Sequence, residues 1–146
     1  MSNNNEIINP ISNYTRIEVR YAETDQMGVV HHSVYPIYFE QARVDWLRSM
    51  GMHYQKMEDS GVILPLNKLS VDYKRPAKFG DVLKVKTSLD QLPGATITFN
   101  YEIKNQNDEL LTQGQTILVF VNEATRRPMR CPESIMNLIL EANSKN

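Results

Sequence analysis

The sequence predicts one α+β domain in which a curved antiparallel β-sheet wraps around a single long helix. Two patterns carry this prediction. Apolar residues recur at helical spacing from about Ser33 to Met50, whereas the chain after Val62 alternates between apolar and polar residues in segments separated by short turns. A helix that is apolar on most of its surface has to be buried, and a curved sheet is the simplest cover for it.

Length and composition are those of an ordinary globular protein with one hydrophobic core. The chain has 146 residues and a formal net charge of −1, so we expect neither nucleic acid nor a membrane among its partners. The only cysteine, Cys131, excludes an intramolecular disulfide and fits a reducing compartment, which leads us to expect a cytoplasmic protein. No apolar run approaches the roughly 20 residues that a membrane span needs.

The chain is expected to begin with a flexible arm over residues 1–13, which is rich in Ser and Asn and lacks the features of a signal peptide. A single domain over residues 14–146 follows. From Tyr14 to Tyr21 apolar and charged residues alternate, which predicts a strand with one buried face. A loop with Asp25 and Gly28 comes next.

The long helix is predicted to extend from about Ser33 to Met50. Ser33 is a candidate N-cap, Pro36 is tolerated in the first turn, and Gly51 fits the position that ends the helix. Its buried face is expected to consist of Tyr35, Phe39, Ala42, Trp46 and Met50.

Four further strands and a final helix are predicted after the long helix. The connection over residues 52–61 is irregular or helical, and short turns between the later strands favour a meander. The predicted strands are 62–74, 83–87, 97–103 and 110–121, and Pro132 opens the final short helix.

Several kinds of functional site are not supported by the sequence. It contains no Gly-x-Ser-x-Gly elbow, no Walker loop and no dinucleotide-binding fingerprint. We expect no metal site either, because the only histidines are His31, His32 and His53, and neighbouring histidines on an extended segment point in opposite directions.

Asp25 is the strongest candidate for a catalytic group. It lies in the loop just before the long helix, whose first N–H groups are unpaired and carry partial positive charge. An aspartate here could simply cap the loop. A thioester, however, is electrophilic, and its leaving thiol has a pKa of about 8.5 by analogy with cysteine. One carboxylate, acting as base or nucleophile, would therefore suffice if backbone amides polarised the carbonyl.

Three motifs carry a family resemblance. They are Asp25-x-x-Gly28-Val29-Val30 with His32-x-x-Tyr35, the helical Phe39-Glu40-x-Ala42-Arg43, and Ser70-Val71-Asp72-Tyr73-x-x-Pro76-Ala77-x-x-Gly80-Asp81. Together they resemble the hot-dog-fold thioesterases of the 4-hydroxybenzoyl-CoA thioesterase family. The sequence is most similar to the branch of acyl-CoA thioesterases encoded with the Tol-Pal envelope system. The resemblance covers roughly residues 14 to 125.

The resemblance implies a hot-dog fold, a homodimer or homotetramer, and hydrolysis of an acyl-CoA to free acid and CoA. It implies Asp25 as nucleophile or general base, and the backbone amide at His32 as the group that binds the thioester oxygen. Gly28 and Val29 would lie against the substrate. No cofactor is expected, because CoA enters as part of the substrate. The alternatives are an acyl-ACP or aryl-CoA thioesterase, or a non-catalytic module that binds acyl-CoA or another protein.

Two further groups of residues are candidates for substrate binding. Tyr35, Phe39 and Trp46 could line an acyl pocket or could be plain core residues. A basic cluster around one strand end could bind the phosphates of CoA or an acidic acyl carrier protein, or could simply be a solvated sheet edge; it consists of Lys68, Lys74, Arg75 and Lys78.

Glu40, three residues before Arg43, is either a rival catalytic base or part of a structural ion pair.

Overall fold

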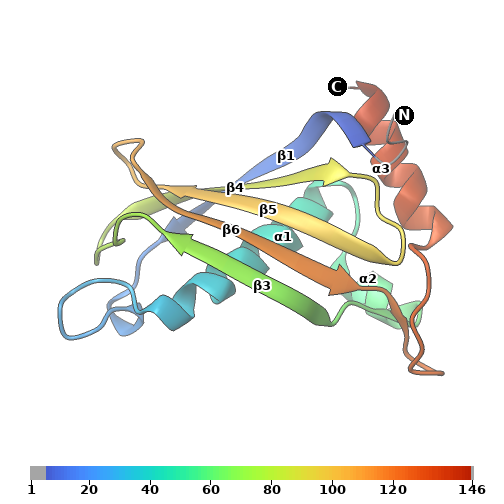
Figure 1. Ribbon diagram of the computed structural model, residues 1–146, viewed down its shortest axis with the longest axis horizontal. Helices are drawn as coiled ribbons and strands as arrows, with labels where there is room; N and C mark the ends of the chain where they lie inside the picture. The colour runs from blue at the N-terminus through green and yellow to red at the C-terminus, as the bar shows by residue number, and fades with distance from the viewer. Residues whose placement is uncertain (1–5, 146) are drawn as a thin grey trace.

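The computed structural model describes residues 6–145, and Figure 1 shows a curved sheet laid across one long helix. The elements are β1 (Glu6–Glu18), η1 (Tyr21–Glu23), η2 (His32–Val34), α1 (Tyr35–Ser49), α2 (Tyr54–Asp59), β2 (Val62–Ile63), β3 (Leu66–Tyr73), β4 (Val82–Gln91), β5 (Thr96–Lys104), β6 (Leu110–Val119), β7 (Val121–Asn122) and α3 (Glu133–Lys145), where η marks a short 3₁₀-helix. The α+β class and the long central helix are therefore confirmed.

The sheet is antiparallel, with the strand order β1-β4-β5-β6-β3. The predicted meander is correct for β4, β5 and β6 but wrong for β3, which pairs with β6 at the far edge of the sheet. The reason lies in residues 74–81, which cross the end of the sheet instead of forming a hairpin. This connection is tied to the loop before α1, because Val30 N–H donates to the Ala77 carbonyl at 2.8 Å and Val29 forms a bridge with Lys78.

The hydrophobic core lies between α1 and the sheet. The ring of Phe39 stacks on Tyr101 with 4.3 Å between centroids, and Trp46 meets Phe99 edge-on at 5.2 Å. Gly114 on β6 makes this close packing possible, since a Cβ atom there would lie 2.3 Å from Cζ of Phe39. The predicted burial of the α1 face is thus confirmed for Tyr35, Phe39, Ala42 and Trp46, whereas Met50 is half-buried and follows the end of the helix.

Strand β1 begins much earlier than the sequence indicates. It starts at Glu6, and Ile11 pairs with Leu89 of β4. The expected flexible arm over 1–13 is wrong for residues 6–13, while residues 1–5 lie outside the described part of the chain. Backbone pairing explains the difference, together with a hydrogen bond from Trp46 Nε1 to the Ile11 carbonyl at 2.9 Å. Apolar and polar residues do not alternate regularly over residues 6–13, and Pro10 is unfavourable within a strand, so the sequence pattern does not indicate a strand there.

The remaining predicted elements need only small corrections. Gly51 has a φ of +84° and ends α1 as expected, because glycine adopts this conformation without steric cost. The predicted strand over 62–74 is divided into β2, which pairs with β7, and β3. Within residues 6–145, no helix has both the length and the apolar character needed to cross a bilayer.

Candidate active site

The loop that carries Asp25 is closed by its own backbone. Thr24 and Val30 form a bridge, the Asp25 N–H donates to the Val29 carbonyl at 2.8 Å, and the Gly28 N–H donates to the Asp25 carbonyl at 3.0 Å. Gly28 has a φ of +77°, a left-handed conformation that most side chains disfavour. The loop is therefore a tight, internally bonded turn directly before the long helix.

The Asp25 side chain is half-buried and only partly engaged by this loop. Its Oδ1 accepts hydrogen bonds from the N–H groups of Met27 at 2.8 Å and Val29 at 3.4 Å. No donor among residues 6–145 reaches its Oδ2. The loop thus fixes the orientation of the carboxylate through one oxygen and leaves the other free to act on water or on a carbonyl carbon.

The start of the helix offers an unpaired donor close by in the chain. His31, and not the expected Ser33, caps the first turn: its Nδ1 accepts from Ser33 N–H at 3.2 Å, and its carbonyl accepts from Val34 N–H at 2.9 Å. The His31 N–H itself donates to the Glu23 carbonyl at 2.9 Å. In the described part of the chain, by contrast, no acceptor takes the N–H of His32. This amide, at the positive end of α1, suits a developing oxyanion.

A cavity of about 240 Å³ opens beside His32. The Tyr73 hydroxyl at the end of β3 donates to the His32 carbonyl at 3.0 Å, and the Tyr73 ring packs edge-on against Tyr35 at 5.2 Å. The Tyr35 hydroxyl accepts a hydrogen bond from Ala77 N–H at 3.3 Å, and burial raises its pKa, so the phenol is neutral. The cavity is lined by Val30, His32, Tyr35, Tyr73, Lys74, Arg75 and Pro76.

The three predicted pocket aromatics have different surroundings. Tyr35 lines the cavity next to His32 and is therefore placed to contact a substrate. Phe39 and Trp46 are buried in the core against Tyr101 and Phe99 and do not line this cavity, which agrees with the alternative that the sequence left open.

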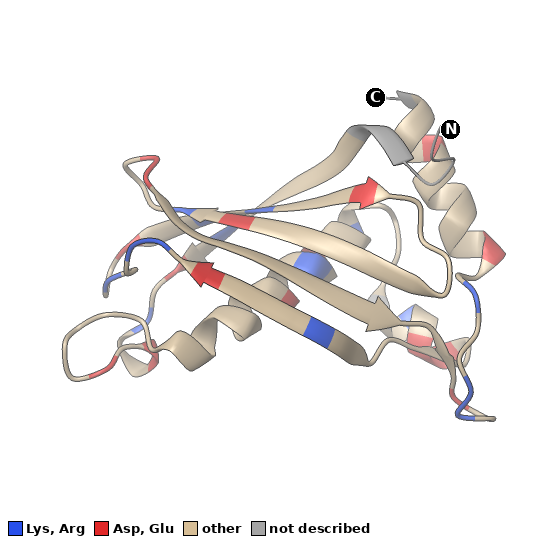
Figure 2. Ribbon diagram, viewed as in Figure 1, with Lys and Arg blue, Asp and Glu red and all other residues tan. Residues whose placement is uncertain are grey.

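The predicted basic cluster is divided by β3. Lys74, Arg75 and Lys78 follow the end of the strand, and Lys78 is paired with Val29 of the Asp25 loop. Lys68 lies near the start of β3, about 20 Å from Lys74 at the usual 3.3 Å per residue. Figure 2 shows these basic segments at opposite ends of β3. The prediction that all four residues form one cluster is wrong, because β3 is fully extended between them.

The basic residues at the cavity are not equally available. Arg75 already forms an ion pair with Glu109, with 2.6 Å between Nη1 and Oε2. Lys74 is exposed, lines the cavity and has no carboxylate partner among the described residues. Lys74 is therefore the side chain best placed to meet a phosphate.

Glu40 is not part of this arrangement. Its exposed side chain lies 3.9 Å from Arg43, as the ion-pair alternative predicted. It lines a groove on the outer side of α1 together with Arg16 and Arg48. This position gives Glu40 no role at the cavity beside His32.

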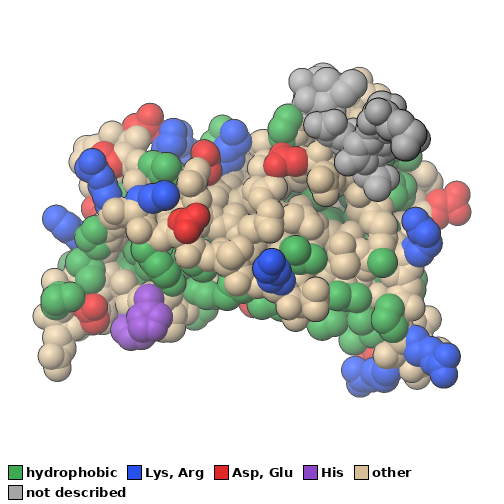
Figure 3. Space-filling model, viewed as in Figure 1, with side chains coloured by type: hydrophobic (Ala, Val, Ile, Leu, Met, Phe, Trp, Pro, Cys, Tyr) green, Lys and Arg blue, Asp and Glu red, His purple; other side chains and the backbone are tan. Residues whose placement is uncertain are grey.

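The histidines lie differently from the prediction. The rings of His31 and His32 lie side by side, with 4.1 Å between their centroids, because the chain turns from the extended backbone of His31 into η2 at His32. Figure 3 shows histidine side chains exposed on the surface beside hydrophobic ones. Among the described residues, no group of three or more His, Cys, Asp or Glu side chains is arranged to hold a metal ion.

Sequence reasoning missed two residues of this region. Tyr73 binds the His32 carbonyl, and Glu23 holds the other end of the loop through the His31 N–H. Tyr73 is part of one of the quoted motifs, but nothing in the sequence indicates that its hydroxyl binds the His32 carbonyl. Glu23 resembles any charged residue at a strand end, and local pattern gives no signal of its burial.

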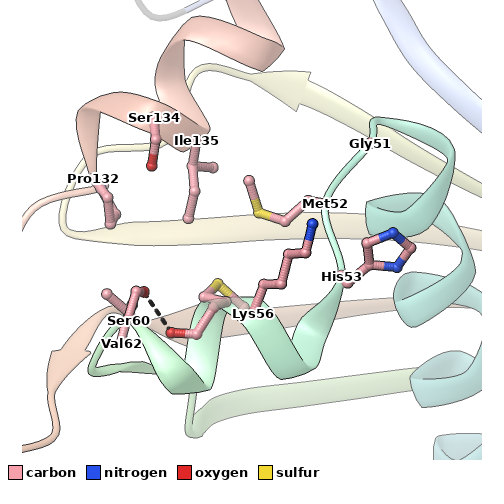
Figure 4. A pocket seen from close by; sticks show the side chains of 10 residues that line it. Gly51, Met52, His53, Lys56, Ser60, Val62, Pro132, Ser134 and Ile135 are labelled. Atoms are coloured by element: carbon pink, nitrogen blue, oxygen red, sulfur yellow. Dashed lines mark hydrogen bonds between the residues drawn. The ribbon is translucent and has the colours of Figure 1, made fainter.

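A second cavity, of about 190 Å³, lies between α2 and α3 (Figure 4). Met52, Met57 and Ile135 give it a largely apolar wall, and Lys56 and His53 lie at its edge. Gly51 also lines it, which places the cavity at the C-terminal end of α1, away from the Asp25 loop. It contains no carboxylate, so we do not place the reaction there.

The chain is similar to known thioesterases in sequence. A profile of the thioesterase-like superfamily matches residues 19–139. The chain is 30% identical over 120 residues to a protein named acyl-CoA thioester hydrolase YbgC from Escherichia coli O6:H1 (strain CFT073), and the match covers 82% of this chain and 90% of that protein.

Solved structures give the same result for the fold. A DHNA-CoA thioesterase from Staphylococcus aureus superposes with a TM-score of 0.83 at 39% identity, covering 92% of this chain and 89% of that one. Slr0204, a 1,4-dihydroxy-2-naphthoyl-CoA thioesterase from Synechocystis, gives a TM-score of 0.82 at 27% identity, covering 89% and 96%. The hot-dog fold and the family resemblance predicted from sequence are confirmed.

Proposed function

Because the chain belongs to the thioesterase-like superfamily, we propose that it hydrolyses an acyl-CoA to the free acid and CoA at the N-terminal end of α1. One observation carries the assignment of the site. Asp25 Oδ2 and the His32 N–H both lack a partner among the described residues, although most other N–H groups of the loop are hydrogen-bonded, namely those of Asp25, Met27, Gly28, Val29, Val30 and His31. An unpaired acceptor and an unpaired donor at the end of one helix suit a reaction that needs both.

In the proposed reaction, the thioester oxygen binds to the His32 N–H. Asp25 removes a proton from water as the water attacks the acyl carbon, or attacks that carbon itself and forms an anhydride that water then opens. In both cases the C–S bond breaks and CoA leaves as a thiolate. One oxyanion donor typically contributes about 2.7–4 kcal/mol to the transition state, and the α1 dipole adds to it.

The substrate would enter through the cavity lined by Tyr35 and Tyr73. The acyl group would lie against these rings and against the Gly28–Val29 segment, and Lys74 and Lys78 would meet the phosphates of CoA. The reaction needs no cofactor, since CoA is part of the substrate and product. We place the enzyme in the cytoplasm, where the free thiol of Cys131 would stay reduced.

The acyl group defines a second candidate. The Staphylococcus aureus neighbour, at 39% identity, is a DHNA-CoA thioesterase, which favours an aryl-CoA as the substrate. An acyl carrier protein is an alternative to CoA as the carrier of the acyl group, because it is acidic and Lys74 and Lys78 are exposed and basic. All three substrates would use the same Asp25 and His32 machinery.

A thiol-release screen tests the assignment. Short, long and aromatic acyl-CoAs and acyl-ACP are compared as substrates for the wild type and for Asp25→Asn, with the exposed Asp59→Asn as a matched control. We expect Asp25→Asn to lower kcat by about 10²–10⁴-fold, the usual contribution of a general base, and to retain the wild-type Tm. Near-wild-type turnover by this variant would remove Asp25 from the mechanism. Acyl-CoA binding without any thiol release would instead indicate a non-catalytic module.

We also propose that the protein is a homodimer formed through β3. This strand is an edge of the sheet and is exposed along almost its whole length, including Leu66, Leu69 and Tyr73. Such an edge readily pairs with another strand. An antiparallel pairing of two copies centred on Ser70 would bring Lys68 of each copy opposite Asp72 of the other, which is a charge-complementary register.

A charge-swap experiment tests this dimer. Sedimentation is expected to show that Lys68→Asp weakens dimerisation and that the double variant Lys68→Asp, Asp72→Lys restores it. Lys84→Asp, on the exposed face of β4, is the matched control. A dimer that Lys68→Asp leaves unchanged would contradict the proposed register.

A further inference from the structure

Glu23 is a carboxylate buried between the Asp25 loop and α1. Only 9% of the residue is exposed. Its Oε1 accepts hydrogen bonds from the Arg20 N–H and from the Tyr38 hydroxyl, both at 2.9 Å, and its Oε2 accepts from Arg20 Nε at 3.0 Å. Both carboxylate oxygens are therefore held, one of them by a buried tyrosine of the long helix.

The main chain of Glu23 makes a second connection. Its carbonyl oxygen accepts the His31 N–H at 2.9 Å. Glu23 stands two residues before Asp25, and His31 stands directly before His32. One residue thus joins the start of the loop, the end of the loop and the body of α1.

The ionisation of the two partners supports a strong bond between Glu23 and Tyr38. Burial acts to raise the pKa of the Glu23 carboxyl, but the hydrogen bonds from the Arg20 amide, the Tyr38 hydroxyl and the Arg20 side chain outweigh it, so this pKa lies below its ordinary value. Burial, and then Glu23 itself, raise the pKa of Tyr38. At neutral pH a charged carboxylate therefore accepts from a protonated phenol, a charge-assisted hydrogen bond.

We propose that Glu23 is a positioning residue, which fixes the distance and angle between the Asp25 carboxylate and the His32 N–H by tying both ends of the loop to Tyr38. The inference rests on the proposed function. A displacement of reacting groups by about 1 Å can cost about 100-fold in rate, so a loop that carries a catalytic base needs such an anchor. Glu23 also closes a capping box at η1 by accepting from the Arg20 N–H, and the test below separates this structural contribution from positioning.

The test compares Glu23→Gln, Tyr38→Phe and their double variant with the wild type. Glu58→Gln, an exposed glutamate on α2, is the matched control. We expect Glu23→Gln to lower kcat about tenfold or more while KM changes less than twofold. Tyr38→Phe should have a smaller effect in the same direction. The double variant should lose less than the product of the two single losses, since both changes remove the same bond.

Two further readouts separate positioning from a merely structural role. All rates are measured well below the Tm of each variant. Glu23→Asp, which keeps the negative charge, should have a higher kcat than Glu23→Gln. Amide hydrogen exchange at His31 should be faster in Glu23→Gln than in Glu58→Gln. An inactive wild type would contradict the proposed function, whereas unchanged kcat and His31 exchange in Glu23→Gln, with an active wild type, would overturn this inference.

Discussion

The two ends of α1 differ in how their backbone groups are satisfied. At the C-terminal end, the N–H groups of Met50, Gly51 and Met52 all donate to carbonyls of the last helical turns. At the N-terminal end, the His32 N–H has no acceptor among residues 6–145, and Asp25 Oδ2 has no donor. Both ends adjoin a cavity, but the cavity at the N-terminal end is lined by His32, whose N–H has no acceptor within residues 6–145, and an unpaired N–H at a helix N-terminus suits an oxyanion.

Changes at the C-terminal end of α1 should alter the stability of the fold and leave the chemistry intact. Changes at the N-terminal end should alter rate or substrate affinity and lower the free energy of unfolding by no more than about 1.5 kcal/mol, the upper net value of one hydrogen bond.

The largest effect on stability is expected from Met57→Ala at the C-terminal end. Met57 belongs to α2, is 5% exposed and lines the second cavity. Its removal should lower the free energy of unfolding by about 2–5 kcal/mol, the usual cost of truncating a buried methionine. Urea unfolding measures the loss, and kcat of the folded variant should match that of the wild type. A lower kcat in the folded variant would show that the two ends are coupled.

Tyr73→Phe should have an intermediate effect at the N-terminal end. The substitution removes the hydrogen bond to the His32 carbonyl, which holds the residue whose amide is proposed to bind the oxyanion. We expect kcat to fall several-fold, with a loss of stability of about 0.5–1.5 kcal/mol, the usual net value of one hydrogen bond. Tyr14→Phe, at an exposed position of β1, controls for loss of a phenol. Equal kinetics in the two variants would contradict a role for Tyr73.

Lys74→Gln should change substrate affinity by a smaller amount. An exposed charge pair contributes about 0.2–1 kcal/mol, so KM for acyl-CoA should rise about two- to fivefold, and the difference from wild type should shrink at high salt. Lys84→Gln, on the exposed face of β4, is the matched control. A KM that does not respond to Lys74→Gln would place the phosphates of CoA elsewhere.

The smallest effect concerns Cys131, which is half-buried beside α3. Burial raises the pKa of this thiol to about 11, so it stays protonated at neutral pH and its reaction with disulfide reagents should be slow. The reaction should speed up as the pH rises toward 11, because only the thiolate attacks. Colour development with a chromogenic disulfide measures the rate, and unfolded protein supplies the fast reference. A rapid reaction of the native thiol at pH 7 would show an accessible, activated cysteine instead.

Local sequence patterns are sufficient to predict most helices and strands and the part of the candidate site that lies within one loop. Helical and strand periodicities identify α1, the sheet strands and α3 because side-chain burial repeats every 3.6 or 2 residues. Asp25, Gly28 and His32 lie within eight residues of one another, so their proximity follows from one loop.

Which distant segments of the chain meet can be read only from the three-dimensional structure. It placed β3 at the free edge of the sheet, carried Lys68 away from Lys74, extended β1 back to Glu6 and put Tyr38 against Glu23. Each of these outcomes depends on hydrogen bonds or packing between residues far apart in the chain, or on backbone pairing that leaves no alternation of side chains. Local periodicity reports which side of an element is buried, but it carries no information about the partner that buries it.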